Sequence, residues 1–219
     1  MERDKKKADL NQFVEYSCLH PTVTEREVME TIELVVEHNY GGICLPPYWV
    51  KKARRELAGA DTKLITVVGY PFGYSRSEPK RIEIEKAIDE GVDELDITMN
   101  FTAFKSDSTG WAKVEVAQFS KIAHVSNVFM KIIIETAYLM PTEIQKACKI
   151  SVDGGADFVS LGTGLVHTVP DQSTVQYVRD LLPKTVGVKS YSFELKAIES
   201  ILEAGAERVG FLSKSIVSP

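Results

Sequence analysis

The sequence predicts an α/β protein built as a single-domain (β/α)8 TIM barrel. Two observations predict this fold. Eight short runs rich in β-branched apolar residues alternate with longer stretches of helical periodicity, and several junctions repeat a helix end, a glycine, a small residue and an acid. Gly155-Ala156-Asp157 and Gly205-Ala206-Glu207 are two such junctions. A glycine there can adopt the left-handed conformation that ends a helix, so a tight turn leads into the next parallel strand.

The individual elements follow from the same patterns. The apolar runs predict strands at 14–19, 41–46, 63–70, 94–100, 129–136, 158–164, 185–191 and 208–213. The amphipathic stretches predict helices at 25–37, 78–89, 111–123, 141–152, 173–182 and 194–204. We expect one domain over residues 1–219, with residues 1–12 forming a solvated arm or a short helix that closes the bottom of the barrel.

A doubly wound open sheet is the competing fold. It needs fewer strands and usually has a glycine-rich turn after the first strand. The corresponding turn here is Leu19-His20-Pro21-Thr22, which contains no glycine. The number of strands and this turn both favour the barrel.

Composition limits the classes of partner. The chain has 219 residues, of which 44% are hydrophobic and 26% charged, and its net charge of −5 argues against nucleic acid or an anionic membrane as the main partner. No apolar run reaches the length of a membrane span. The three cysteines (Cys18, Cys44 and Cys148) are odd in number and have no metal-ligand spacing, so we expect free thiols and a cytoplasmic location.

Charged residues inside apolar strands are the main signal of function. Asp96 lies in the run 94–98 and Lys189 in the run 186–190, whereas the comparable position of the run 158–164 is Ser160. A buried charge costs several kcal/mol unless it is paired or used. Because barrel enzymes place reactive groups at the carboxyl ends of strands, we predict catalytic roles for Asp96, Lys131 and Lys189. Predicted substrate-binding residues are Glu15, Ser17, Cys44, Ser160, Thr163, Gly164, Ser190 and Ser213.

A carboxylate beside two amines suits proton transfer or amine chemistry on a carbonyl group. We expect the two ammonium groups to lower the pKa of at least one lysine, and the alternative is a buried ion pair that only neutralises itself. Cys44 is more typical of a small buried hydrophobic residue than of a nucleophile. His20 and His167 have no metal-ligand spacing with an acid, so the sequence predicts neither a metal nor another cofactor.

Several motifs resemble those of the deoxyribose-phosphate aldolase family. The order and spacing of the similar segments agree over the first two thirds of the chain. These segments are Glu15-Tyr16-Ser17-Cys18-Leu19-His20-Pro21-Thr22, Gly42-Ile43-Cys44-Leu45-Pro46-Pro47, Thr66-Val67-Val68-Gly69-Tyr70-Pro71-Phe72-Gly73, Asp93-Glu94-Leu95-Asp96 and Lys131-Ile132-Ile133-Ile134-Glu135-Thr136. The resemblance implies a TIM-barrel lyase of carbohydrate metabolism.

The resemblance also implies roles for individual residues. Asp96 corresponds to the aspartate that relays protons, and Lys189 to the lysine that lowers the pKa of the reactive lysine. The reactive lysine itself, which forms a Schiff base with the aldehyde, corresponds to Ser160. A hydroxyl group cannot form an iminium ion, so we expect the usual covalent step to be absent or moved to Lys131 or Lys189.

Further differences lie downstream. Ser192-Phe193 replaces the Gly-Gly pair whose amides hold phosphate in the family, Leu212-Ser213 replaces a Ser-Ser pair, and Leu165 replaces a frequent lysine. Two functions therefore stay open: a carbon–carbon lyase or proton-transfer enzyme acting on a small sugar-like substrate, or an inactive relative that binds a metabolite or a protein. We expect a small polar ligand in either case, and the sequence leaves a homodimer open.

Overall fold

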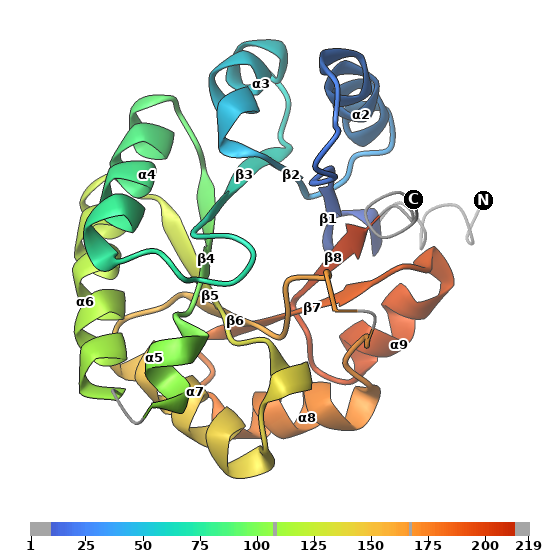
Figure 1. Ribbon diagram of the computed structural model, residues 1–219. Helices are drawn as coiled ribbons and strands as arrows, with labels where there is room; N and C mark the ends of the chain where they lie inside the picture. Colours follow the sequence, from blue (N-terminus) through green and yellow to red (C-terminus); the bar gives the residue numbers. More distant parts are fainter. Residues whose placement is uncertain (1–9, 107–108, 167, 213–219) are drawn as a thin grey trace.

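The computed structural model describes residues 10–106, 109–166 and 168–212, and it contains a closed barrel of eight parallel strands in sequential order (Figure 1). This confirms the predicted (β/α)8 fold. The strands are β1 (Val14–Ser17), β2 (Gly42–Leu45), β3 (Lys63–Val68), β4 (Glu94–Thr98), β5 (Phe129–Ile133), β6 (Phe158–Ser160), β7 (Gly187–Ser192) and β8 (Arg208–Leu212). The predicted arm up to residue 9, His167 and Ser213 lie outside the described residues.

Helices surround the ring of strands (Figure 1). They are α2 (Glu25–Glu37), α3 (Val50–Glu56), α4 (Ser77–Asp89), α5 (Phe101–Lys105), α6 (Thr109–Val125), α7 (Pro141–Asp153), α8 (Gln172–Leu181) and α9 (Ile198–Glu203), with 3-10 turns η1 (Pro47–Trp49), η2 (Thr136–Tyr138) and η3 (Leu195–Ala197). All six predicted helices are present, although the last is divided into η3 and α9. Within the part of the chain that is described, no helix is both long and apolar enough to span a membrane.

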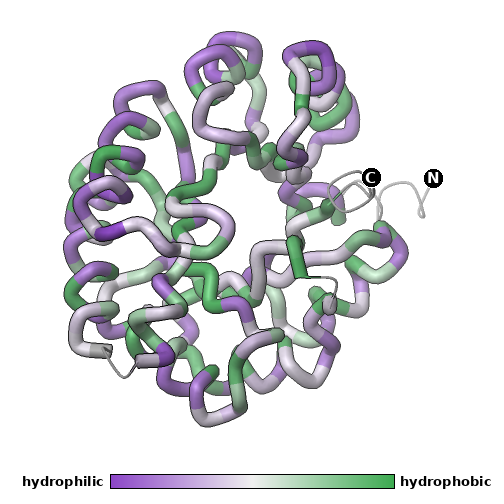
Figure 2. The backbone as a smooth tube through the Cα atoms, viewed as in Figure 1, coloured by the Kyte–Doolittle hydropathy of each residue, from purple (hydrophilic) through white to green (hydrophobic). Residues whose placement is uncertain are grey.

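Side chains point alternately outward and inward along each strand, which separates an apolar outer layer from a polar barrel interior. Ile97, Val159 and Val188 belong to the large hydrophobic core. Their neighbours Asp96 and Lys189 contact each other instead, because successive strand residues point to opposite faces. Hydrophobic and hydrophilic residues also alternate along the surrounding helices (Figure 2). The apolar strand faces and the helices therefore form the core, and the barrel interior is left for charged groups.

Strands β1 to β6 end earlier than predicted, whereas β7 ends one residue later, at Ser192. β6 ends at Ser160, after which the chain enters a turn that includes Gly164 at φ +77°. In the sheet register Ser160 lies beside Ile133 of β5 and Lys189 of β7. The position that the sequence comparison singled out is therefore the last strand residue beneath the mouth, next to a lysine.

Candidate active site

Asp96, Lys131 and Lys189 converge inside the barrel, with Lys131 deeper than the mouth where we expected all three. Asp96 lies on β4 in register with Lys131 of β5, and its Oδ1 is 3.3 Å from the Lys131 Nζ. The other oxygen, Oδ2, accepts a hydrogen bond from the Lys189 Nζ at 2.5 Å. Asp96 therefore joins the two lysines, and the three side chains share one centre.

Two glutamates complete the centre. The Lys131 Nζ is 2.8 Å from Glu15 Oε1 and 2.5 Å from Glu94 Oε2, and Lys189 forms a second ion pair with Glu15. Glu94 was not predicted, although it lies two residues before Asp96 and so on the same strand face. The Nε atom of Arg208 is 3.7 Å from Glu15 Oε1. Among the described side chains that meet here, three carboxylates face three cationic groups.

The carboxylates decide the pKa values of the lysines. Burial would lower the pKa of Lys131 and of Lys189, but Asp96 and Glu15 outweigh burial and raise both pKa values above the ordinary lysine value. The expectation that one lysine pKa is lowered is therefore wrong, because it considered only one carboxylate beside the two amines and left out the glutamates. Burial would raise the pKa of Glu15, yet the lysines lower it to about 2. Both lysines are ammonium ions at neutral pH.

Only part of the predicted substrate-binding set reaches the cavity in the barrel mouth. This cavity has a volume of about 20 Å³, enough for one water molecule. Of the predicted residues it is lined by Ser17, Asp96, Thr163 and Lys189. Glu15 and Lys131 lie deeper in the ion-pair network, with exposed fractions near zero.

The remaining predicted residues have different surroundings. Cys44 packs against Ile65 and Val67, and burial raises the pKa of its thiol, so the group is a neutral part of the wall. Ser190 follows Lys189 and points to the opposite face of β7, where its Oγ is buried without a hydrogen-bond partner. Ser160 is buried beside Lys189, and Gly164 contributes its turn conformation.

Two tyrosines cover the mouth, and sequence reasoning missed both. The Tyr70 hydroxyl donates a hydrogen bond to the carbonyl oxygen of Thr163 at 2.9 Å, across 93 positions of sequence. The Tyr191 hydroxyl lies 2.7 Å from the carbonyl oxygen of Thr168, to which it donates. Tyr70 and Tyr191 both line the cavity, so they account for its small volume.

Glu135 fixes the turn that receives Tyr70. Its Oε2 accepts hydrogen bonds from the Thr163 backbone N–H at 2.8 Å and from the Thr163 hydroxyl at 2.6 Å. Burial raises the pKa of this carboxyl despite those bonds. Glu135 also has a φ of +29°, which is rare for a residue with a side chain and is typical of functional sites. Glu135, Thr163 and Tyr70 form one chain of contacts over the centre.

Comparison with known proteins identifies the family. Residues 4–212 match the model of the DeoC/LacD family aldolases. The chain belongs to this family. It is 32% identical to the deoxyribose-phosphate aldolase of Brevibacillus brevis, covering 92% of this chain and 91% of that protein, and 33% identical to that of Thermococcus kodakarensis, covering 93% of each.

Solved structures agree with the aldolase family fold. The aldolase QR15 superposes with a TM-score of 0.88 at 30% identity and covers 95% of this chain and 93% of its own. The deoxyribose-phosphate aldolase of Aeropyrum pernix has a TM-score of 0.87 at 24% identity, covering 96% and 88%, and supports the fold alone. The DeoC/LacD aldolase fold is therefore present with a serine beside Lys189.

Proposed function

We propose that this DeoC/LacD family member acts on the carbonyl group of a small hydroxycarbonyl substrate by proton transfer, without a Schiff base. The observation that supports the proposal best is the Lys189 ammonium beside Asp96, with a cavity against both. A raised lysine pKa suits hydrogen-bond donation to a carbonyl oxygen and opposes nucleophilic attack, which needs a neutral amine. The Ser160 hydroxyl, at the position of the family's reactive lysine, cannot form an iminium ion.

The proposed reaction is a non-covalent retro-aldol cleavage or the related enolisation. In cleavage, the proton of the β-hydroxyl passes to Asp96, the adjacent carbon–carbon bond breaks, and its electron pair moves through the new enolate to the carbonyl oxygen. Lys189 stabilises that oxygen by its hydrogen bond. The proton on Asp96 then returns to the enolate carbon, so that the products are two carbonyl compounds and the centre regains its original charges.

Access of a substrate to the centre requires the wall of this cavity to open, because the cavity against Lys189 holds about one water molecule. This same observation favours the second candidate, a relative that binds a ligand at the mouth without catalysis. Its fixed charges would then serve the fold alone. The cytoplasmic location stays a prediction from the sequence, and the sequence leaves a homodimer open.

Acetaldehyde separates the candidates in two measurements. We expect no lysine to be trapped when the protein is treated with acetaldehyde and borohydride and then mapped by mass spectrometry. In D2O we expect catalysed exchange of the methyl protons by NMR, abolished in Asp96→Asn. Trapping of Lys189 or Lys131 would overturn the Schiff-base-free proposal, and absence of both trapping and exchange would favour the binding protein.

A further inference from the structure

A larger cleft lies beside the small cavity and shares walls with it. The cleft has a volume of about 380 Å³, which is in the range of small-molecule sites. Leu19, Val67 and Tyr70 line both spaces. Leu19, Val67 and Tyr70 therefore form a shared wall between the open cleft and the cavity that touches Asp96 and Lys189, so a ligand in the cleft lies next to the centre.

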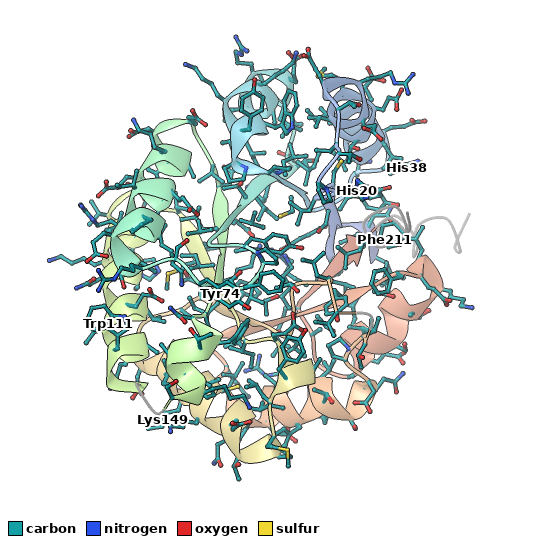
Figure 3. The ribbon with its side chains drawn as sticks, viewed as in Figure 1. His20, His38, Tyr74, Trp111, Lys149 and Phe211 are labelled. Carbon is teal, nitrogen blue, oxygen red and sulfur yellow. The ribbon has the colours of Figure 1, made fainter. Side chains whose placement is uncertain are left out.

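Most of the described lining of the cleft is apolar or aromatic, and Ser75 and Glu83 are its other polar side chains. Prolines 46, 47 and 71 form one part of it, and Phe72 and Tyr74 form another, with their ring centroids 5.1 Å apart in a stacked arrangement. Figure 3 shows Tyr74 over the ring of strands, whereas Trp111 lies on the outer helix α6. Phe72 is 46% exposed and Tyr74 65% exposed, so these rings are open to a ligand.

Charge in the cleft disfavours an anionic ligand. The described lining includes no lysine, arginine or histidine, and its one charged residue is Glu83, whose Oε2 accepts the Gly69 backbone N–H at 2.7 Å. A phosphate needs cationic groups or free backbone amides, and here the nearby amide is already used by a carboxylate. The described lining of the cleft therefore offers a phosphate no cationic side chain, and Glu83 would repel it.

The geometry points to a substrate with an uncharged apolar or aromatic substituent, which binds in this cleft while its carbonyl group is directed past Tyr70 toward Lys189. The inference rests on the proposed function for the position of the carbonyl group. Burial of a phenyl-sized group against the prolines and the Phe72–Tyr74 pair supplies the affinity, and Tyr70 is a positioning residue at the entrance.

Calorimetry with 3-phenylpropanal, acetaldehyde and 2-deoxyribose 5-phosphate tests the inference. We expect 3-phenylpropanal to bind at least about tenfold more tightly than either other probe, from the added apolar burial. Phe72→Ala and Tyr74→Ala should each weaken its binding about three- to tenfold. Trp111→Ala, which removes a ring of similar exposure at 55% from outside the cleft, is the matched control and should change nothing.

Equal or tighter binding of the phosphosugar would overturn the inference, as would unchanged affinity in both cleft variants when circular dichroism shows them folded. Calorimetry requires no turnover, and the acetaldehyde exchange experiment uses a molecule without an apolar substituent. Failure of the cleft inference is therefore distinguishable from failure of the proposed chemistry.

Discussion

Ser160→Lys tests the electrostatics of the centre most directly. Ser160 lies in register with Lys189, so the new amine enters beside an ammonium group. Adjacent strands are about 4.8 Å apart. Asp96 and Glu15 already contact the existing lysines, and three carboxylates face three cationic groups among the described side chains of the centre. The existing charges of the centre sum to zero, so the added ammonium is one positive charge in excess, and the Lys189 ammonium is its neighbour in the sheet register.

The expected pKa of the new amine follows from these distances. Two unit charges about 5 Å apart at an effective dielectric constant of about 20 repel by about 3 kcal/mol, which is roughly two pKa units. The pKa falls from about 10.4 to about 8, and the neutral fraction at pH 7.5 rises from about 0.1% to about a quarter. Because the folded-state pKa is lower than the unfolded one, the variant loses about 3 kcal/mol below pH 8 and regains stability between about pH 8 and 10.

The assay is borohydride trapping with acetaldehyde, followed by mass mapping. Ser160→Lys should be trapped at position 160, while the wild type and Ser160→Met stay at background. Ser160→Met has a similar length without the amine, so it separates chemistry from overpacking. A folded Ser160→Lys variant that is not trapped at any pH up to 10 would refute the electrostatic reasoning, and so would a wild type that traps Lys189.

Three further predictions follow from the same structure. 2-Deoxyribose 5-phosphate should bind no better than 2-deoxyribose in calorimetry, because Ser192-Phe193 replaces a glycine pair; low-micromolar, phosphate-dependent binding would contradict this. The pKa of Glu15 is lowered to about 2 in the folded protein, so ionisation of this carboxyl stabilises the fold above about pH 4.5. This contribution to the free energy of unfolding, about 3 kcal/mol, is lost as the pH falls to 2. Urea unfolding of Glu15→Gln should show a shallower pH slope than the wild type. Lys80→Met should cost about 3–5 kcal/mol, because Lys80 donates to Glu115 at 3.1 Å in a fully buried pair, and adding Glu115→Leu should recover part of the loss.

The barrel could be predicted from local sequence patterns, because each strand and each helix has its own periodicity of apolar residues. The short helices α3 and α5 were missed, since seven and five residues are too few for a helical period to stand out. Asp96, Lys131 and Lys189 were found because charges are conspicuous in apolar strands. Glu94 was overlooked because it lies at the start of its strand, one layer deeper in the barrel than Asp96.

Contacts across the barrel mouth could not be predicted from local sequence patterns. No local signal pairs Tyr70 with Thr163, because their contact depends on the closure of eight strands. The same holds for the direction of the lysine pKa shifts. It depends on how many carboxylates the closed barrel brings within reach, and Glu15 comes from the opposite end of the chain to Lys189.

The charged centre contributes to stability in a way that does not require catalysis. Removing Asp96 or Lys189 leaves an opposite charge buried and unpaired, which typically costs about 3–5 kcal/mol. A serine at position 160 leaves no unpaired buried charge, because the described carboxylates of the centre are already paired with Lys131, Lys189 and Arg208. The ion-pair network alone therefore does not distinguish an enzyme from a binding protein. The two candidates are distinguished by measuring proton exchange of acetaldehyde together with ligand binding in the aromatic cleft.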